Sequence, residues 1–223
     1  MSKQYSLIPE ETAIVIIDMQ NSFVNLRGSI GRNGYDASMM NGTIPYVKEL
    51  VEACRENSIQ DIWVTQNHYK EDVTRETHRI RPHTHRWKAG SPAIVGTWES
   101  EIVDELKPLA DSSSEIIIKH RFSAFIDTRL KTLLRMKGIN TLIVCGVGTA
   151  HCVESTVRDA YQLDYDVLVA EEGVAGMSIE DHESSINIMK KVFGLTLKNN
   201  DMLNLINGGL LSLELKTEEE VKY

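Results

Sequence analysis

The 223-residue sequence has little of what marks exported, membrane-spanning or nucleic-acid-binding proteins. No stretch approaches the ~18 uninterrupted apolar residues of a membrane-spanning helix, and we expect no signal peptide near the first residue. Lysine and arginine total 24 against 32 aspartate and glutamate residues, which gives a net charge of −8. Because nucleic acids and anionic membranes both bind basic surfaces, neither is expected as a partner.

Cysteine is also scarce, and the chain contains only Cys54, Cys145 and Cys152. An odd number of cysteines without an expected export signal favours free thiols in a cytoplasmic protein. The sequence has no CxxC pair and no Cys/His spacing of the zinc-finger type. A structural zinc site is therefore not expected.

Short β-branched runs alternate with helical segments along the chain. Continuous runs of this kind are typical of parallel strands whose two faces are both covered. The predicted strands lie at 13–18, 61–67, 115–120, 141–147, 166–172 and 193–197. The predicted helices lie at 43–58, 128–138, 152–163 and 180–194. The alternation predicts an α/β fold, a Rossmann-like three-layer sandwich with a parallel sheet of about six strands and helices on both faces.

The chain shows no repeat and no glycine/serine linker, so we expect one domain over residues 1–223. Residues from about 68 to 98 lack a regular pattern, and we expect them to cap a site as a long loop. Residues from about 210 to 223 are rich in charge and are expected to form a tail.

Chemically capable side chains stand where successive strands are predicted to end. Asp18 closes the first strand, Lys119 closes the third, and Cys152 follows the fourth after a glycine-containing loop. In parallel α/β sheets the ligand lies beyond the carboxyl ends of the strands. Taken alone, an aspartate at a strand end is typical of a cap, a lysine there of a solvated surface, and a cysteine near a buried strand of core packing. Core packing is how we interpret Cys54 and Cys145. The joint placement at one edge is what favours catalysis.

Cys152 has the surroundings of a nucleophile. A thiol attacks only as a thiolate, and a free cysteine titrates near pH ~8.5. Asp18 is the candidate base, and Lys119 would keep Asp18 ionised and stabilise the thiolate. The predicted helix that begins after Cys152 also favours negative charge at its first turn. Backbone amides of the loop from Gly146 to Ala150, with that of Cys152, are candidates for an oxyanion hole.

The motifs around these residues resemble the isochorismatase-like cysteine hydrolase superfamily over roughly residues 10–205. They read AIVIIDMQNSFV, KHRFSAFIDTRL and CGVGTAHCVESTVRDAYQLDYDVLVAEEGVAG. The resemblance implies a catalytic triad of Asp18, Lys119 and Cys152, with an oxyanion hole built from the amides of Gly148 and Cys152. It also implies a cis peptide between Val147 and Gly148, and a homodimer or homotetramer.

Within that superfamily the chain is most similar to the ureidoacrylate, biuret and N-carbamoylsarcosine amidohydrolases. The similarity implies a cysteine-dependent amidohydrolase that takes a small ureido, carbamoyl or carboxamide substrate. It implies release of ammonia through a thioester intermediate, with no cofactor. Expected substrate contacts, each of which could equally be packing or lid structure, are Phe23, Asn67, Trp87, Phe125 and His151.

Three alternatives stay open. A nicotinamidase-like enzyme would bind a metal through some of His68, His78, His83 and His85, although Gln66-Asn67-His68-Tyr69 lacks the Asp-x-His pair of those enzymes. An isochorismatase-type hydrolase would cleave a vinyl ether. His151 in the sequence TAHC fits its loop, but true isochorismatases lack the cysteine. A non-catalytic member would use the pocket only to hold a ligand.

Overall fold

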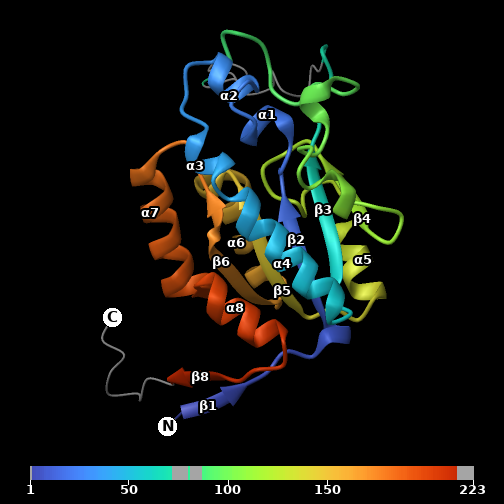
Figure 1. Cartoon of the computed structure of the whole chain (residues 1–223), viewed down its shortest axis with the longest axis vertical. Helices are drawn as coiled ribbons and strands as arrows, with labels where there is room; N and C mark the ends of the chain where they lie inside the picture. The colour runs from blue at the N-terminus through green and yellow to red at the C-terminus, as the bar shows by residue number, and fades with distance from the viewer. Residues whose placement is uncertain (1, 72–79, 81–86, 215–223) are drawn as a thin grey trace.

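The computed structural model describes residues 2–71, 80 and 87–214. Its main sheet is formed by β2 (Thr12–Ile17), β3 (Gln60–Gln66), β4 (Glu115–Lys119), β5 (Thr141–Val147), β6 (Asp166–Ala175) and β7 (Leu195–Leu197). The strands are all parallel and lie in the order β4-β3-β2-β5-β6-β7 (Figure 1). Each predicted strand is thus confirmed within a few residues of its expected bounds.

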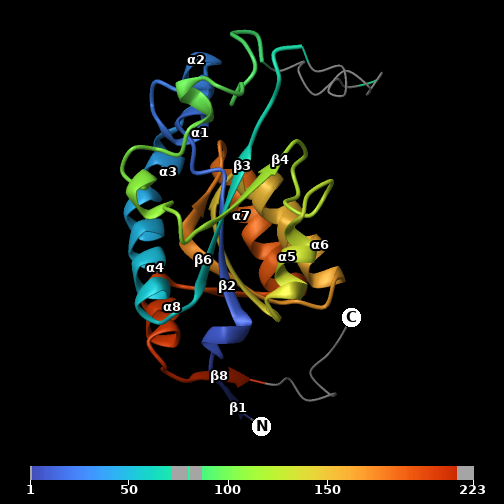
Figure 2. The same cartoon turned by 90° about the vertical axis from the view of Figure 1, so that its right-hand side faces the viewer.

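Helices cover both faces of this sheet (Figure 2). One face carries α4 (Ile44–Glu56) and α8 (Asn199–Ile206), and the other carries α5 (Leu130–Met136), α6 (Glu154–Gln162) and α7 (Ile179–Ile188). Three short helices, α1 (Asn21–Val24), α2 (Ser29–Arg32) and α3 (Ser38–Asn41), follow β2. The three-layer α/β sandwich expected from the sequence is confirmed. No helix in the described ranges is long and apolar enough to cross a membrane.

The central strand β2 shows why the strands are apolar along their whole length. Its residues alternate between two separate cores. Ile14 and Ile16 belong to the core under α4 and α8, and Val15 and Ile17 belong to the core under α5, α6 and α7. All four side chains are fully buried. A strand between two helical layers has no solvent face, so alternation with polar residues is absent.

The sequence patterns missed two strands, the helix α8 and the short helices α1, α2 and α3. β1 (Ser2–Tyr5) pairs antiparallel with β8 (Leu211–Glu214) at the end of the molecule opposite α1 and α2 (Figure 1). Both strands are short and β1 is mostly polar, so neither gives a recognisable period. β8 therefore occupies the beginning of the segment expected as a charged tail. The predicted helix 180–194 is α7 followed by a π-helical turn, Met189–Phe193.

Glycine at position 146 lets β5 lie against β2 at the edge where the site forms. Gly146 has φ +117°, and a Cβ placed there would stand 2.1 Å from the carbonyl oxygen of Ile17. Any side chain would push the two strands apart one residue before Asp18. The close approach thus sets the spacing between the end of β2 and the loop that precedes Cys152.

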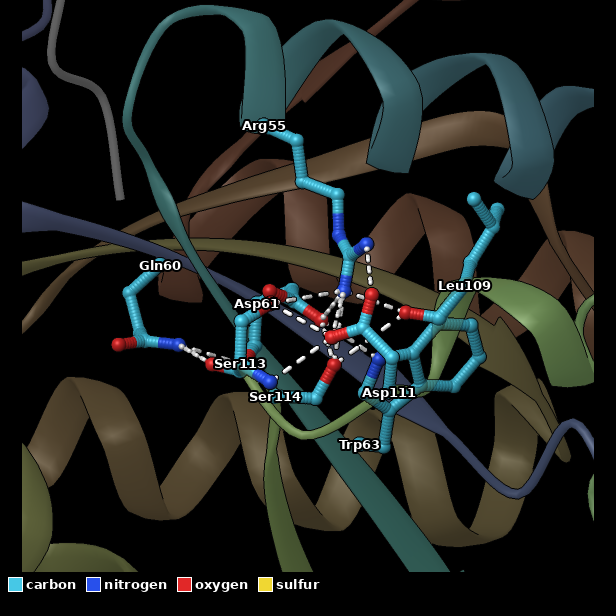
Figure 3. Close-up of polar contacts among 8 residues, drawn as sticks. All are labelled: Arg55, Gln60, Asp61, Trp63, Leu109, Asp111, Ser113 and Ser114. Carbon is cyan, nitrogen blue, oxygen red and sulfur yellow. Dashed lines mark hydrogen bonds and ion pairs between the residues drawn. The ribbon is translucent and has the colours of Figure 1, made fainter.

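A buried polar cluster at the amino end of β3 ties three segments together (Figure 3). The Asp61 Oδ2 accepts hydrogen bonds from Trp63 Nε1 at 2.8 Å, Ser114 Oγ at 2.5 Å and the Arg55 guanidinium at 3.2 Å. Arg55, near the end of α4, also donates to the carbonyl of Leu109 at 2.5 Å and to Asp111 at 3.0 Å. The side chains of Arg55 and Asp61 are 24% and 5% exposed. The cluster fastens α4 and the loop before β4 to β3.

Replacing Arg55 by alanine is predicted to destabilise the fold by about 3 kcal/mol, because it leaves the buried Asp61 carboxylate without its cation. Chemical denaturation followed by circular dichroism measures the free energy of unfolding. The matched control is Arg129→Ala, which removes a 57%-exposed arginine from its pair with Glu115 and should cost about 1 kcal/mol or less. Equal losses in the two variants would contradict the role assigned to Arg55.

Candidate active site

Asp18, Lys119 and Cys152 meet at the carboxyl edge of the sheet. The Lys119 Nζ lies 2.8 Å from Asp18 Oδ2 and 3.3 Å from Cys152 Sγ. Lys119 is the last residue of β4, Asp18 follows β2, and Cys152 follows β5. The parallel topology therefore delivers residues that are far apart in the chain to one point.

The Lys119 ammonium is completely buried. Burial lowers its pKa, but the negative charge of Asp18 and the neighbouring Cys152 raise it by more, so the pKa lies above its ordinary value. Lys119 is therefore charged at neutral pH. A fixed buried cation between a carboxylate and a thiol favours the anionic form of both.

Asp18 is held in an unusual backbone conformation with one carboxylate oxygen unpaired. Its φ is +54°, a left-handed conformation that costs a non-glycine residue about 1–3 kcal/mol. Its amide donates to the carbonyl of Val64 at 2.9 Å, and its carbonyl accepts from the amide of Gln20 at 2.7 Å. The Oδ2 oxygen is bound by Lys119, whereas the buried Oδ1 has no hydrogen-bond partner among the described residues. That oxygen is the one available to take a proton.

Cys152 lies within a π-helical turn, Thr149–Val153, that leads into α6. Cys152 thus lies inside this wider turn and not at a free helix start, as was predicted. Its carbonyl accepts from Thr156 Oγ1 at 2.7 Å. Burial and then the charge of Asp18 raise the thiol pKa far above its ordinary value, and Lys119 offsets this only in part. Burial therefore favours the neutral thiol over the thiolate.

The loop before the nucleophile requires two corrections. The described residues contain no cis peptide bond, so the bond between Val147 and Gly148 is trans. Gly148 makes the turn instead by adopting φ +81°, which glycine reaches without the cost of a cis bond. In addition, the Gly148 amide donates to the carbonyl of Ala175 at 2.8 Å and is not free to bind an oxyanion. The Cys152 amide stays the proposed donor.

Gly148 has a second role beside the thiol. A Cβ at this position would lie 3.6 Å from the Cys152 nitrogen and 3.8 Å from its Sγ. The missing side chain therefore keeps open the space in front of the sulfur and its amide. A reacting carbonyl group needs that space.

A cavity of about 60 Å³ opens onto the thiol and the Asp18 carboxylate. Its lining is mostly apolar and consists of Asp18, Phe23, Ile30, Met40, Trp87, Phe122, Val147, Gly148, His151, Cys152 and Met177. Of the expected substrate contacts, Phe23, Trp87 and His151 do line it. His151 lies edge-on to Phe122, with ring centroids 5.4 Å apart.

Two expected contacts lie elsewhere. Phe125 stacks on Tyr165, with ring centroids 5.9 Å apart, and packs against the core under α5 and α6. The wall is formed instead by Phe122 from the same KHRFSAF motif. Asn67 is not in the cavity lining. The backbone N–H of Asn67 donates to the carbonyl of Lys119. The side-chain Oδ1 of Asn67 is buried without a partner among the described residues. The turn after β4 has no regular period, so sequence could not decide which aromatic faces the thiol.

With this geometry in place, comparison with known proteins identifies the family. The isochorismatase domain model matches residues 12–201. The chain belongs to the isochorismatase family. It is 31% identical over 214 residues to ureidoacrylate amidohydrolase RutB of Agrobacterium fabrum, covering 91% of this chain and 92% of that one. It is 34% identical over 182 residues to a probable inactive nicotinamidase of Arabidopsis thaliana, covering 81% and 89%.

Solved structures agree on the fold. A cysteine hydrolase from Pseudomonas syringae pv. phaseolicola superposes with a TM-score of 0.77 at 23% identity, covering 91% of this chain and 95% of that one. At that identity the similarity speaks for the architecture alone. The parallel sheet flanked by helices is thus the family's architecture.

The histidines considered as metal ligands divide into two groups. His68 is buried, and its Nε2 lies 3.1 Å from the Nε2 of Gln66. A metal bound to that nitrogen would displace this contact. His78, His83 and His85 lie outside the described residues. Over the described part of the chain, no group of three or more His, Cys, Asp or Glu side chains is arranged to hold a metal ion.

Replacing Lys119 by methionine is predicted to slow alkylation of Cys152 by iodoacetamide at neutral pH at least about tenfold. Loss of the adjacent cation raises the thiol pKa, and one pKa unit is a factor of ten in thiolate. Peptide mapping by mass spectrometry separates Cys152 from Cys54 and Cys145. Lys107→Met, which changes an exposed lysine, is the control. Unchanged Cys152 alkylation in a folded Lys119→Met protein would contradict the assigned electrostatics.

Proposed function

We propose that this protein is a cysteine-dependent amidohydrolase that cleaves a small ureido or carbamoyl substrate and releases ammonia through a thioester intermediate. The observation that carries the proposal is the buried Lys119 ammonium, shared between the Asp18 carboxylate and the Cys152 thiol at the floor of a cavity. A base, a nucleophile and a cation in contact are the parts that acyl transfer requires.

The first stage forms the thioester. Asp18 takes the thiol proton on its unpaired Oδ1, and the Cys152 sulfur bonds to the carbonyl carbon. Lys119 stabilises the thiolate as it forms, since its Nζ is 3.3 Å from the sulfur. The carbonyl oxygen becomes an oxyanion bound by the Cys152 amide. The carbon–nitrogen bond then breaks, Asp18 gives its proton to the leaving nitrogen, and ammonia departs.

The second stage restores the enzyme. A water molecule enters the place that ammonia left and gives a proton to Asp18 as its oxygen attacks the thioester carbon. The carbon–sulfur bond breaks, and the sulfur recovers a proton from Asp18. With a ureido substrate the product is a carbamic acid, which decomposes to an amine and carbon dioxide. In each stage, Asp18 thus accepts one proton and then gives it up.

The substrate class rests on two supports. The relative from Agrobacterium fabrum, which this chain matches along nearly its whole length, is named for action on ureidoacrylate. The cavity is small and walled mainly by apolar and aromatic side chains, and Asp18 and Cys152 are among its lining residues. Such a site fits a compact substrate that presents one terminal carbonyl group to Cys152.

A binding protein without catalysis is the second candidate, because one relative is named as a probable inactive nicotinamidase. The site argues against it. Holding a ligand does not require a charged lysine buried against both an aspartate and a cysteine, and burying such charges is costly. Vinyl-ether cleavage is disfavoured on the resemblance alone, since Cys152 is present.

Ammonia release is predicted for at least one of ureidoacrylate, biuret, N-carbamoyl amino acids, nicotinamide and simple amides, with a ureido compound fastest. On that substrate, Cys152→Ala should lose at least about 10³-fold in kcat, as expected when the nucleophile of a triad is removed. Cys54→Ala, which changes a buried cysteine away from the site, is the control and should retain turnover. Wild-type rates in Cys152→Ala would overturn the proposal.

The thioester itself is tested by mass spectrometry of enzyme quenched in acid during turnover. The Cys152 peptide should gain the mass of the substrate minus ammonia. Steady turnover with no modified Cys152 peptide, even when the quench follows mixing within one turnover, would argue for direct attack by water.

A further inference from the structure

Lys119 has a third partner, which belongs to neither the base nor the nucleophile. The Gln66 Oε1 lies 2.5 Å from Lys119 Nζ, closer than either Asp18 Oδ2 or Cys152 Sγ. A lysine ammonium has three donors, and here each meets one acceptor. Gln66 is the last residue of β3 and is buried, with 4% of its surface exposed.

Gln66 is itself fixed through its backbone. Its amide donates to Gln20 Oε1 at 2.8 Å, and its carbonyl accepts from Gln20 Nε2 at 3.0 Å. The Gln20 Nε2 also donates to the carbonyl of Ser100 at 2.8 Å. One buried glutamine thus clamps both backbone groups of another, directly under the buried ammonium.

The side-chain amide of Gln66 has only one chemically acceptable orientation. Because Lys119 offers only donors, the Gln66 oxygen must face it and the NH₂ group must face away. The NH₂ group then donates to the Nε2 of His68 at 3.1 Å, so this nitrogen carries no proton. His68 is held by its backbone: its N–H donates to the carbonyl of Ala93, and its carbonyl accepts from the N–H of Val95. The buried side chains of His68, Gln66 and Lys119 thus form a row that links the segment after β3 to the triad.

We infer that Gln66 is a positioning residue of the reaction, oriented by His68, that holds the Lys119 ammonium where Asp18 and Cys152 share it. The inference rests on the proposed function. A neutral acceptor suits this place, because it satisfies the third N–H without adding a negative charge. A carboxylate here would compete with Asp18 for the cation and would raise the pKa of the Cys152 thiol.

Gln66→Glu and Gln66→Met separate the two parts of this role. Glutamate keeps the acceptor but adds charge, and should move the midpoint of Cys152 alkylation by iodoacetamide upward by about one pH unit or more. Methionine keeps the volume but removes the acceptor. It should lower kcat about tenfold or more with KM within about twofold, because a buried N–H loses its partner and the ammonium moves.

Gln162→Met is the matched control, because Gln162 is exposed on α6 away from the triad. It should leave the alkylation profile and kcat unchanged. Alkylation needs no substrate, so it tests the inference even if no amide is cleaved. Wild-type alkylation midpoint in Gln66→Glu together with wild-type kcat in Gln66→Met would overturn the role of Gln66. A shifted midpoint with no amide turnover by the wild type would overturn only the proposed function. Should Gln66→Met not fold, the midpoint in Gln66→Glu decides.

Discussion

The buried ammonium of Lys119 is the interaction on which the site depends. A charge with no exposed surface is tolerated only when its donors are satisfied, and here they meet a carboxylate, a thiol and an amide. The partners come from the ends of β2 and β3 and from the turn after β5, so the cation ties these segments together. Chemistry and architecture at this edge of the sheet thus have a common cause.

The position of the Lys119 ammonium also affects the ionisation of the Cys152 thiol. Burial and the charge of Asp18 raise the pKa of the Cys152 thiol, and the positive charge of Lys119 offsets this only in part. In the proposed mechanism the thiolate forms only when Asp18 accepts the proton. The left-handed backbone of Asp18 is a local strain at the site, whereas glycine lets the turn at Gly148 form without one.

Sequence predicted the sheet because strands between two helical layers leave long β-branched runs, as in β2 and β5. It also brought Asp18, Lys119 and Cys152 to one edge, since parallel strands end together. The predictions were wrong where the geometry depends on irregular turns. Phe125 was expected at the substrate, where the structure has Phe122, and the cis bond that the resemblance implied before Gly148 is trans. Gln66 lies within the predicted strand 61–67, but its partners are set by side-chain rotamers that no sequence period encodes. The homodimer or homotetramer stays a prediction.

The Cys152 thiol is expected to keep its proton in the resting enzyme and to lose it only during the reaction. The far-ultraviolet absorbance of a thiolate, taken as the difference between wild type and Cys152→Ala across a pH titration, measures this directly. No thiolate signal from Cys152 is expected at neutral pH, and the signal should appear only well above the ordinary range of a cysteine. A full thiolate signal at neutral pH would contradict this expectation and would mean that Lys119 and Cys152 form a resting ion pair.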